Sequence, residues 1–129
     1  MLHLWNKRFN YSALKRVTDK SGARHYSLDG NKVPSVTTIL EKTKAQKDID
    51  SLNAWRDRVG QVEATRIINE STSRGDKMHK NLEDALHGKQ SLNFEFSDDI
   101  EKKMSDTIIS HALEKKLNEI WGCEIPLFY

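Results

Sequence analysis

The sequence predicts an α+β chain that is mostly helical, with an N-terminal β-hairpin, four to five helices and a C-terminal strand. Three observations favour this class. Residues 11–33 alternate strand-like runs with Asp- and Gly-rich turns, and residues 34–119 carry apolar side chains at helical spacing. Residues 120–129 return to an apolar, aromatic run. A length of 129 residues suits one domain, so we expect a single domain over 1–129.

Composition narrows the class of protein. Hydrophobic residues make up 36% of the chain and charged residues 31%, yet three tryptophans argue against disorder. The net charge of +2 does not by itself indicate a nucleic-acid binder. Cys123 is the single cysteine, which excludes a disulfide within the chain and fits a reducing compartment. No apolar run approaches the ~20 residues of a membrane span, so we expect a cytoplasmic protein without a membrane partner.

The hairpin is expected from residue types that favour strands and turns. Residues 11–18 and 23–28 predict two strands, joined by the turn Asp19–Gly22. Asp29 and Gly30 then predict a second turn before the helices begin.

The first helix is expected to start after Pro34, with Ser35 at the N-cap. Its first turn carries three hydroxyls, on Ser35, Thr37 and Thr38. One interpretation is a cap with β-branched packing, which is the commoner use of such residues. The other is a phosphate site, because a helix N-terminus offers unpaired amides and a positive dipole.

The remaining helices follow from apolar spacing and capping residues. The composition of the last segment, WGCEIPLFY, predicts a strand, and its open apolar edge would need a partner. We expect helices over 48–59 and 61–69, a helix capped by Ser71 or Thr72 and closed by Gly88, a loop over 89–96, and a long helix capped by Ser97.

The strongest candidate functional residues lie in residues 71–87, STSRGDKMHKNLEDALH. Gly75, His79 and Glu83 are spaced four residues apart and so share one helix face. Glycine costs a helix about 1 kcal/mol relative to alanine, and close approach of a backbone or ligand is a common reason for it. His79 is expected at the rim of the core, where it could ligate a metal or make a simple hydrogen bond. One His and one Glu are too few for a complete metal site.

Two segments in this order resemble PD-(D/E)XK nucleases of the RecB and Cas4-like group, and phage exonucleases similar to the mitochondrial genome maintenance exonuclease. They are Pro34-Ser35-Val36-Thr37 and Arg74-Gly75-x-x-x-His79-x-x-x-Glu83. The resemblance implies that His79 is one ligand of a Mg²⁺ or Mn²⁺ site and that Gly75 is the pattern glycine. It also implies that residues 120–129 open the central sheet of a restriction-endonuclease-like fold.

The sequence departs from this group at the catalytic positions. The group carries an Asp and an Asp/Glu-x-Lys on strands of its sheet. Glu101-Lys102-Lys103 and Glu114-Lys115-Lys116 match the letters, but both fall in the predicted long helix. We therefore expect the N-terminal part of a nuclease, inactive alone, whose catalytic half is supplied in cis or in trans.

The resemblance also implies a substrate. The complete nuclease would hydrolyse single-stranded DNA ends. The resemblance to phage exonucleases also implies that a phage encodes the protein and that it acts in the host cytoplasm. The alternative from another class is a small helical module that binds nucleic acid or protein without catalysis. Under the nuclease hypothesis the DNA contacts are expected from Ser35, Thr37, Thr38, Arg74 and Lys77.

Overall fold

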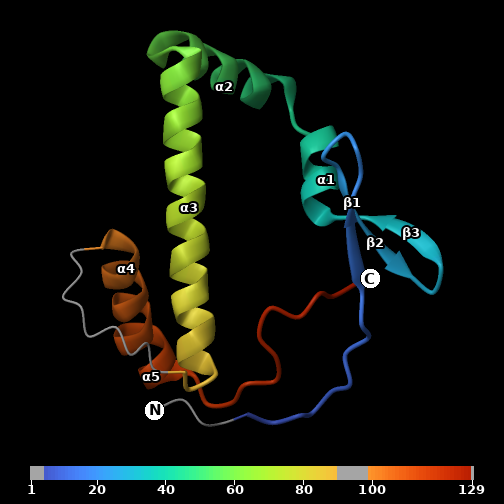
Figure 1. Ribbon diagram of the computed structural model, residues 1–129, viewed down its shortest axis with the longest axis vertical. Helices are drawn as coiled ribbons and strands as arrows, with labels where there is room; N and C mark the ends of the chain where they lie inside the picture. Colours follow the sequence, from blue (N-terminus) through green and yellow to red (C-terminus); the bar gives the residue numbers. More distant parts are fainter. Residues whose placement is uncertain (1–4, 90–98, 129) are drawn as a thin grey trace. The chain divides into compact units, whose positions relative to one another are not determined.

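The computed structural model describes residues 5–89 and 99–128. The described residues form an α+β fold in which a three-stranded antiparallel sheet precedes the helices along the chain (Figure 1). This confirms the predicted mixed class and the antiparallel strands near the N-terminus.

The chain divides into two compact units. We call Tyr11–Ala64 with Pro126–Tyr129 the sheet unit, and Met1–Asn10 with Thr65–Ile125 the helical unit. The sheet unit holds all three strands and the first two helices. Each unit is described by itself below.

The sheet has the strand order β1-β2-β3, with β1 Lys15–Thr18, β2 Arg24–Leu28 and β3 Asn31–Pro34. The predicted hairpin is present, but the first strand is shorter than expected and a third strand follows the second. Asp29 and Gly30 have φ values of 49° and 80°, which suit a two-residue hairpin turn. This turn returns the chain alongside β2, so that Val33 pairs with Tyr26.

Helix α1, Val36–Lys42, begins at Ser35 as predicted, and the Ser35 side chain accepts a hydrogen bond from the Thr38 amide. Helix α2, Gln46–Val59, ends at Gly60. Gly60 has a φ of 88°, which a glycine adopts without a steric cost.

Helix α3, Gln61–Leu86, is continuous (Figure 1). The prediction of two helices, with a cap at Ser71 or Thr72, is therefore wrong. Charged side chains spaced four residues apart bridge this stretch, with Glu70 pairing to residues one turn before and one turn after it. Such pairs stabilise the helical conformation through the serine- and threonine-rich stretch. Gly88, with a φ of 68°, follows the helix as expected.

The last helical segment is α4, Ile100–Ile108, which continues as the π-helical turn η1, Ile109–Leu113, and α5, Glu114–Lys116. It ends earlier than the predicted long helix, because Leu117 is extended. The predicted loop over 89–96 and the predicted cap at Ser97 fall almost entirely outside the described residues. Within the helical unit, Asn81 of α3 donates to the hydroxyl of Ser105, which is fully buried.

The predicted strand over 120–129 is not formed in residues 120–128. Ile120 makes one parallel bridge with Trp5, and its carbonyl accepts a hydrogen bond from the Asn6 amide at 2.9 Å. Beyond it, Glu124 has a φ of 53°, and Pro126 lacks an amide donor. Both features interrupt the extended ladder that a strand requires.

Apolar burial is sparse in the described part of the chain. Among its hydrophobic residues, Ala64 and Ile120 are buried, whereas many large apolar side chains remain exposed. None of the helices described here is long and apolar enough to cross a membrane.

Candidate functional site

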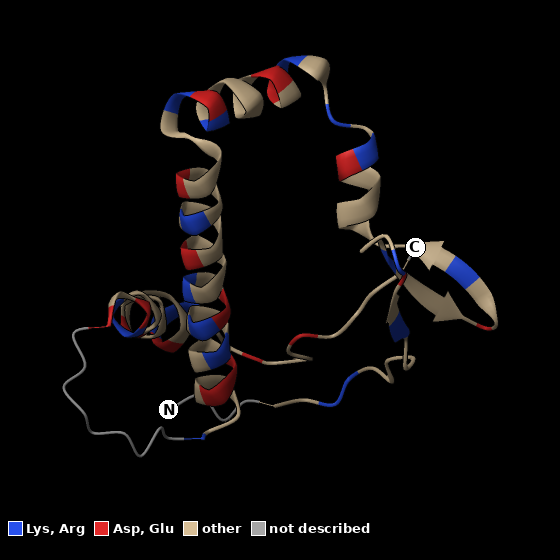
Figure 2. Ribbon diagram, turned by 45° about the horizontal axis from the view of Figure 1, so that its top comes forward, with Lys and Arg blue, Asp and Glu red and all other residues tan. Residues whose placement is uncertain are grey.

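Helix α3 presents the candidate site in the helical unit. Figure 2 shows Lys and Arg positions alternating with Asp and Glu positions along this helix. Gly75, His79 and Glu83 all lie in α3, so the predicted four-residue spacing places them one above another on a single face.

Gly75 does not accommodate a close neighbour within the described part of the chain. A Cβ atom added at this position would meet no heavy atom within 4 Å outside its own helix backbone. Of the two reasons expected for this glycine, close approach of a backbone is therefore wrong for the described residues, and approach of a ligand stays a prediction. What remains is open space on one side of an otherwise regular helix.

His79 is exposed rather than set at the rim of a core, because 65% of its side chain is accessible to solvent. Its Nδ1 atom lies 3.7 Å from Oε1 of Glu124. Glu83, one turn further along α3, lies 3.7 Å from the ammonium group of Lys80. His79 thus stands beside one carboxylate, while Glu83 already has a cationic partner.

A metal ion would need more ligands than this arrangement offers. Among residues 5–89 and 99–128, no group of three or more His, Cys, Asp or Glu side chains could hold a metal ion. Mg²⁺ is held mainly by carboxylate and phosphate oxygens and by waters, and the carboxylate of Glu124 lies 3.7 Å from the Nδ1 atom of His79. The residues described here therefore do not fit a complete Mg²⁺ or Mn²⁺ site.

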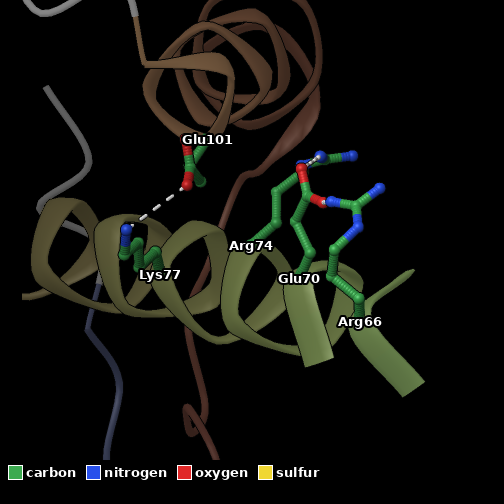
Figure 3. Close-up of polar contacts among 5 residues, drawn as sticks. All are labelled: Arg66, Glu70, Arg74, Lys77 and Glu101. Atoms are coloured by element: carbon green, nitrogen blue, oxygen red, sulfur yellow. Dashed lines mark hydrogen bonds and ion pairs between the residues drawn. The ribbon is translucent and has the colours of Figure 1, made fainter. Parts of the chain in front are cut away.

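The cations of α3 form a ladder of ion pairs (Figure 3). Glu70 binds Arg66 at 2.8 Å through one carboxylate oxygen and Arg74 at 3.1 Å through the other. Each pair spans one helical turn, so the ladder follows directly from the sequence spacing. Arg74, a predicted DNA contact, is engaged by a carboxylate in this arrangement.

Lys77, the other predicted DNA contact on α3, pairs across to α4. Its ammonium group lies 3.5 Å from Oε1 of Glu101, and its side chain is 66% exposed. The hydrogen bond from its own backbone amide lowers the pKa of Glu101, and the charges of Lys77 and Arg74 lower it further. Glu101 is therefore ionised at neutral pH. Its location in α4 agrees with the rejection of Glu101-Lys102-Lys103 as a strand-borne motif.

The three predicted hydroxyl contacts lie in the sheet unit, where they bond to one another. Ser35 Oγ lies 2.9 Å from the hydroxyl oxygens of both Thr37 and Thr38 and is 7% exposed as a residue. The Thr38 hydroxyl donates to the carbonyl of Arg24 in β2 at 3.0 Å. These hydroxyls join α1 to β2, so the capping interpretation describes their arrangement. Helix α1 has seven residues, too short to provide a strong anion site.

Sequence reasoning missed the carboxylates that accompany the candidate cations. Glu70 could have been found, because Arg66, Glu70 and Arg74 stand four residues apart. Glu124 could not, because 45 residues separate it from His79 and no local signal joins them.

Comparison of the chain with family models, with curated proteins and with solved structures finds no match.

Proposed function

We propose that this chain is the N-terminal, DNA-binding part of a metal-dependent nuclease similar to the PD-(D/E)XK group, acting on single-stranded DNA ends. The observation that carries the proposal is the exposure of two candidate side chains on α3. Lys77 and His79 are both about two-thirds exposed, and Gly75 leaves open space one turn before His79. A backbone phosphate could approach Lys77 from solvent without displacing a side chain of the core.

The cations of α3 can bind a phosphate because their present carboxylate partners can be exchanged. Exposed ion pairs contribute on the order of 0–1 kcal/mol, so replacing a carboxylate by a phosphate costs little. Arginine forms paired hydrogen bonds with either anion, and lysine acts as a point charge. Arg74 and Lys77 could therefore release Glu70 and Glu101 when DNA binds.

In this proposal the chain binds DNA, and another segment supplies the catalytic groups. The sequence offers no strand-borne Asp/Glu-x-Lys, and the described residues do not fit a complete metal site. In this proposal, His79 supplies one imidazole, and the catalytic carboxylates and lysine come from a half that joins in cis or in trans. The restriction-endonuclease-like sheet would belong to that assembly.

The test is binding of labelled oligo(dT) to the full chain, measured by fluorescence anisotropy across a salt series. We expect the double variant Arg74→Gln/Lys77→Gln to bind more weakly. Each lost phosphate contact should make the slope of log affinity against log salt shallower by about 0.7. The matched control is Arg16→Gln/Lys20→Gln, which removes the same charge from the sheet unit.

Two outcomes would contradict the proposal. One is an absence of oligo(dT) binding by the unaltered chain, and the other is equal weakening by the control variant. In the same samples, Mn²⁺ should produce no cleavage. Cleavage that persists in His79→Ala would exclude both the assigned metal ligand and the division of work.

A protein-binding module is the second candidate, and one observation favours it. Val36 and Leu40 of α1 are 71% and 62% exposed, which is unusual for apolar residues of adjoining turns. If the unaltered chain fails to bind oligo(dT) and Leu40→Ser abolishes self-association in analytical ultracentrifugation, this second candidate replaces the first.

A further inference from the structure

Aromatic and basic side chains gather where the N-terminal segment of the helical unit meets residues 119–121. The backbone of Trp5 and Asn6 runs beside Ile120, joined by the bridge and by the Asn6 amide. The Asn6 side chain and the Trp121 indole both donate to the carboxylate of Glu119. These bonds fix the segment in place.

Two ring contacts form in this region. Trp5 stacks on His87, with ring centroids 4.8 Å apart and planes inclined by 15°, and its indole donates to the Leu86 carbonyl at 2.8 Å. Phe9 meets Trp121 edge to face at 5.5 Å. We call the four residues that make these contacts, together with Arg8, the aromatic cluster: Trp5, Arg8, Phe9, His87 and Trp121.

The Arg8 guanidinium completes the cluster. Its central carbon lies 4.8 Å from the Trp121 ring centre and 5.8 Å from that of Phe9, both within cation–π range. Lys7 and Lys89 flank the cluster in sequence and are exposed. Two carboxylates lie nearby, those of Glu119 and of Asp84, which interacts with His87 and Lys89. The three cations, Lys7, Arg8 and Lys89, outnumber them, so the surroundings carry a net positive charge.

The aromatic rings are ordered by contacts and yet remain open to solvent. Trp5, Phe9 and Trp121 are 40%, 49% and 44% exposed. A cluster that served core packing alone would bury more of these rings, since burial of apolar surface is what stabilises it. Rings that are fixed, half exposed and surrounded by cations are suited to an anionic partner with flat apolar faces.

We propose that the aromatic cluster is a stacking platform for unpaired bases of a single-stranded nucleic acid. Every base offers a π-face to an aromatic ring, and Arg8 can stack on a base or pair with a phosphate. Base faces in a duplex are covered by their neighbours, so the platform selects single strands. The inference goes beyond the α3 cations and shares with the proposed function the choice of nucleic acid as partner.

The experiment is titration of the full chain with unlabelled oligo(dT) while tryptophan emission is recorded, with a matched duplex as comparison. Stacking on Trp5 and Trp121 should quench emission with the single strand and much less with the duplex. Phe9→Leu should weaken binding about five- to hundredfold, the range found for loss of one base–aromatic stack. The control is Phe128→Leu, which removes an exposed aromatic ring of the sheet unit.

Arg8→Gln is the second variant, because it leaves every ring in place and does not depend on how Phe9→Leu folds. It should weaken binding severalfold, whereas Lys20→Gln should not. Unchanged affinity in Arg8→Gln, alongside weaker binding in Arg74→Gln/Lys77→Gln, would overturn the platform and leave the proposed function standing. Equal loss in Phe128→Leu would also overturn it. An unaltered chain that binds no oligo(dT) would overturn both.

Discussion

The N-terminus of α1 and the exposed face of α3 both carry groups suited to a phosphate, but they use them differently. At α1, in the sheet unit, the Ser35 hydroxyl is nearly buried and lies within hydrogen-bond distance of both neighbouring threonine hydroxyls. On α3, in the helical unit, Lys77 is exposed and its partner Glu101 lies at the long distance of 3.5 Å. The first group holds the fold together, and the second can change partners.

The difference follows from the cost of breaking each kind of contact. Leaving a buried hydrogen-bonding group unsatisfied costs about 1–3 kcal/mol, whereas an exposed ion pair contributes on the order of 0–1 kcal/mol. Turning the α1 hydroxyls toward a ligand would therefore lower the stability of the fold. Releasing the α3 cations from their carboxylates would lower it little. Stability and binding should therefore respond to mutations in different units.

Ser35→Ala tests this separation with the largest expected effect. The substitution removes the N-cap acceptor of α1 and the hydroxyl that lies between Thr37 and Thr38. We expect the free energy of unfolding to fall by about 1–2 kcal/mol, measured by urea denaturation followed by circular dichroism. Affinity for oligo(dT) should stay within twofold.

Thr37→Ala is the matched control for Ser35→Ala. Thr37 is exposed, and its hydroxyl bonds to Ser35 rather than to the backbone. Loss of the Thr37 hydroxyl should change the free energy of unfolding by less than half as much as Ser35→Ala does. A selective loss of DNA affinity in Ser35→Ala, with unfolding unchanged, would show that the hydroxyls bind phosphate and that the comparison is wrong.

Gly75→Ala tests the α3 side of the comparison with a smaller effect. The added Cβ meets no atom within 4 Å, and alanine is the better helix former, so we expect the free energy of unfolding to rise by about 1 kcal/mol. Thermal unfolding by circular dichroism would measure it. If the open space serves a ligand, the same variant should bind oligo(dT) more weakly despite its greater stability.

The matched control for Gly75→Ala is Ser73→Ala, a second small-to-alanine change at an exposed position of α3. It should alter neither binding nor, by more than a few tenths of a kcal/mol, stability. If both alanine variants bind like the unaltered chain, Gly75 has no role in leaving room for a partner.

Local signals in the sequence predicted the parts of the fold that depend on a few neighbouring residues. Ser35 caps α1, and Gly60 and Gly88 follow the ends of α2 and α3, because each needs only its own backbone and one nearby bond. Ser71 misled the prediction, since its capping chemistry competes with the ion pairs of Glu70 one turn away on either side.

Long-range pairing could not be predicted in the same way. The apolar run after Ile120 has strand-like composition, but a strand needs a partner that composition does not specify. The bridge from Ile120 to Trp5 and the contact of His79 with Glu124 join positions far apart in sequence. The candidate face of α3 was therefore predictable, and its carboxylate partners on other elements were not.

The smallest effect we predict is a difference in pH response. The first turn of α1 contains no acidic residue, so its hydroxyl network should not titrate. In the helical unit, hydrogen bonds from Asn6 and then Trp121 lower the pKa of Glu119, and the charge of Arg8 lowers it further. A carboxyl whose pKa is lower in the folded state adds stability above its unfolded pKa of about 4.3 and loses it as the pH falls through the folded pKa.

Acidification through the lowered pKa of Glu119 should therefore release the Trp121 indole while the Thr38 amide stays bonded to Ser35. The Trp121 indole and Thr38 amide signals in ¹H–¹⁵N NMR spectra would follow the two sites in one sample. Glu119→Gln is the control, because its amide oxygen still accepts a hydrogen bond but does not titrate, so the indole signal should lose its pH dependence. Parallel movement of both signals would mean that the two units respond together, since neutral hydroxyls have no proton to gain in this range. An indole signal with the same pH dependence in Glu119→Gln as in the unaltered chain would instead show that Glu119 does not hold Trp121, and the fixed position of the aromatic cluster would lose its main support.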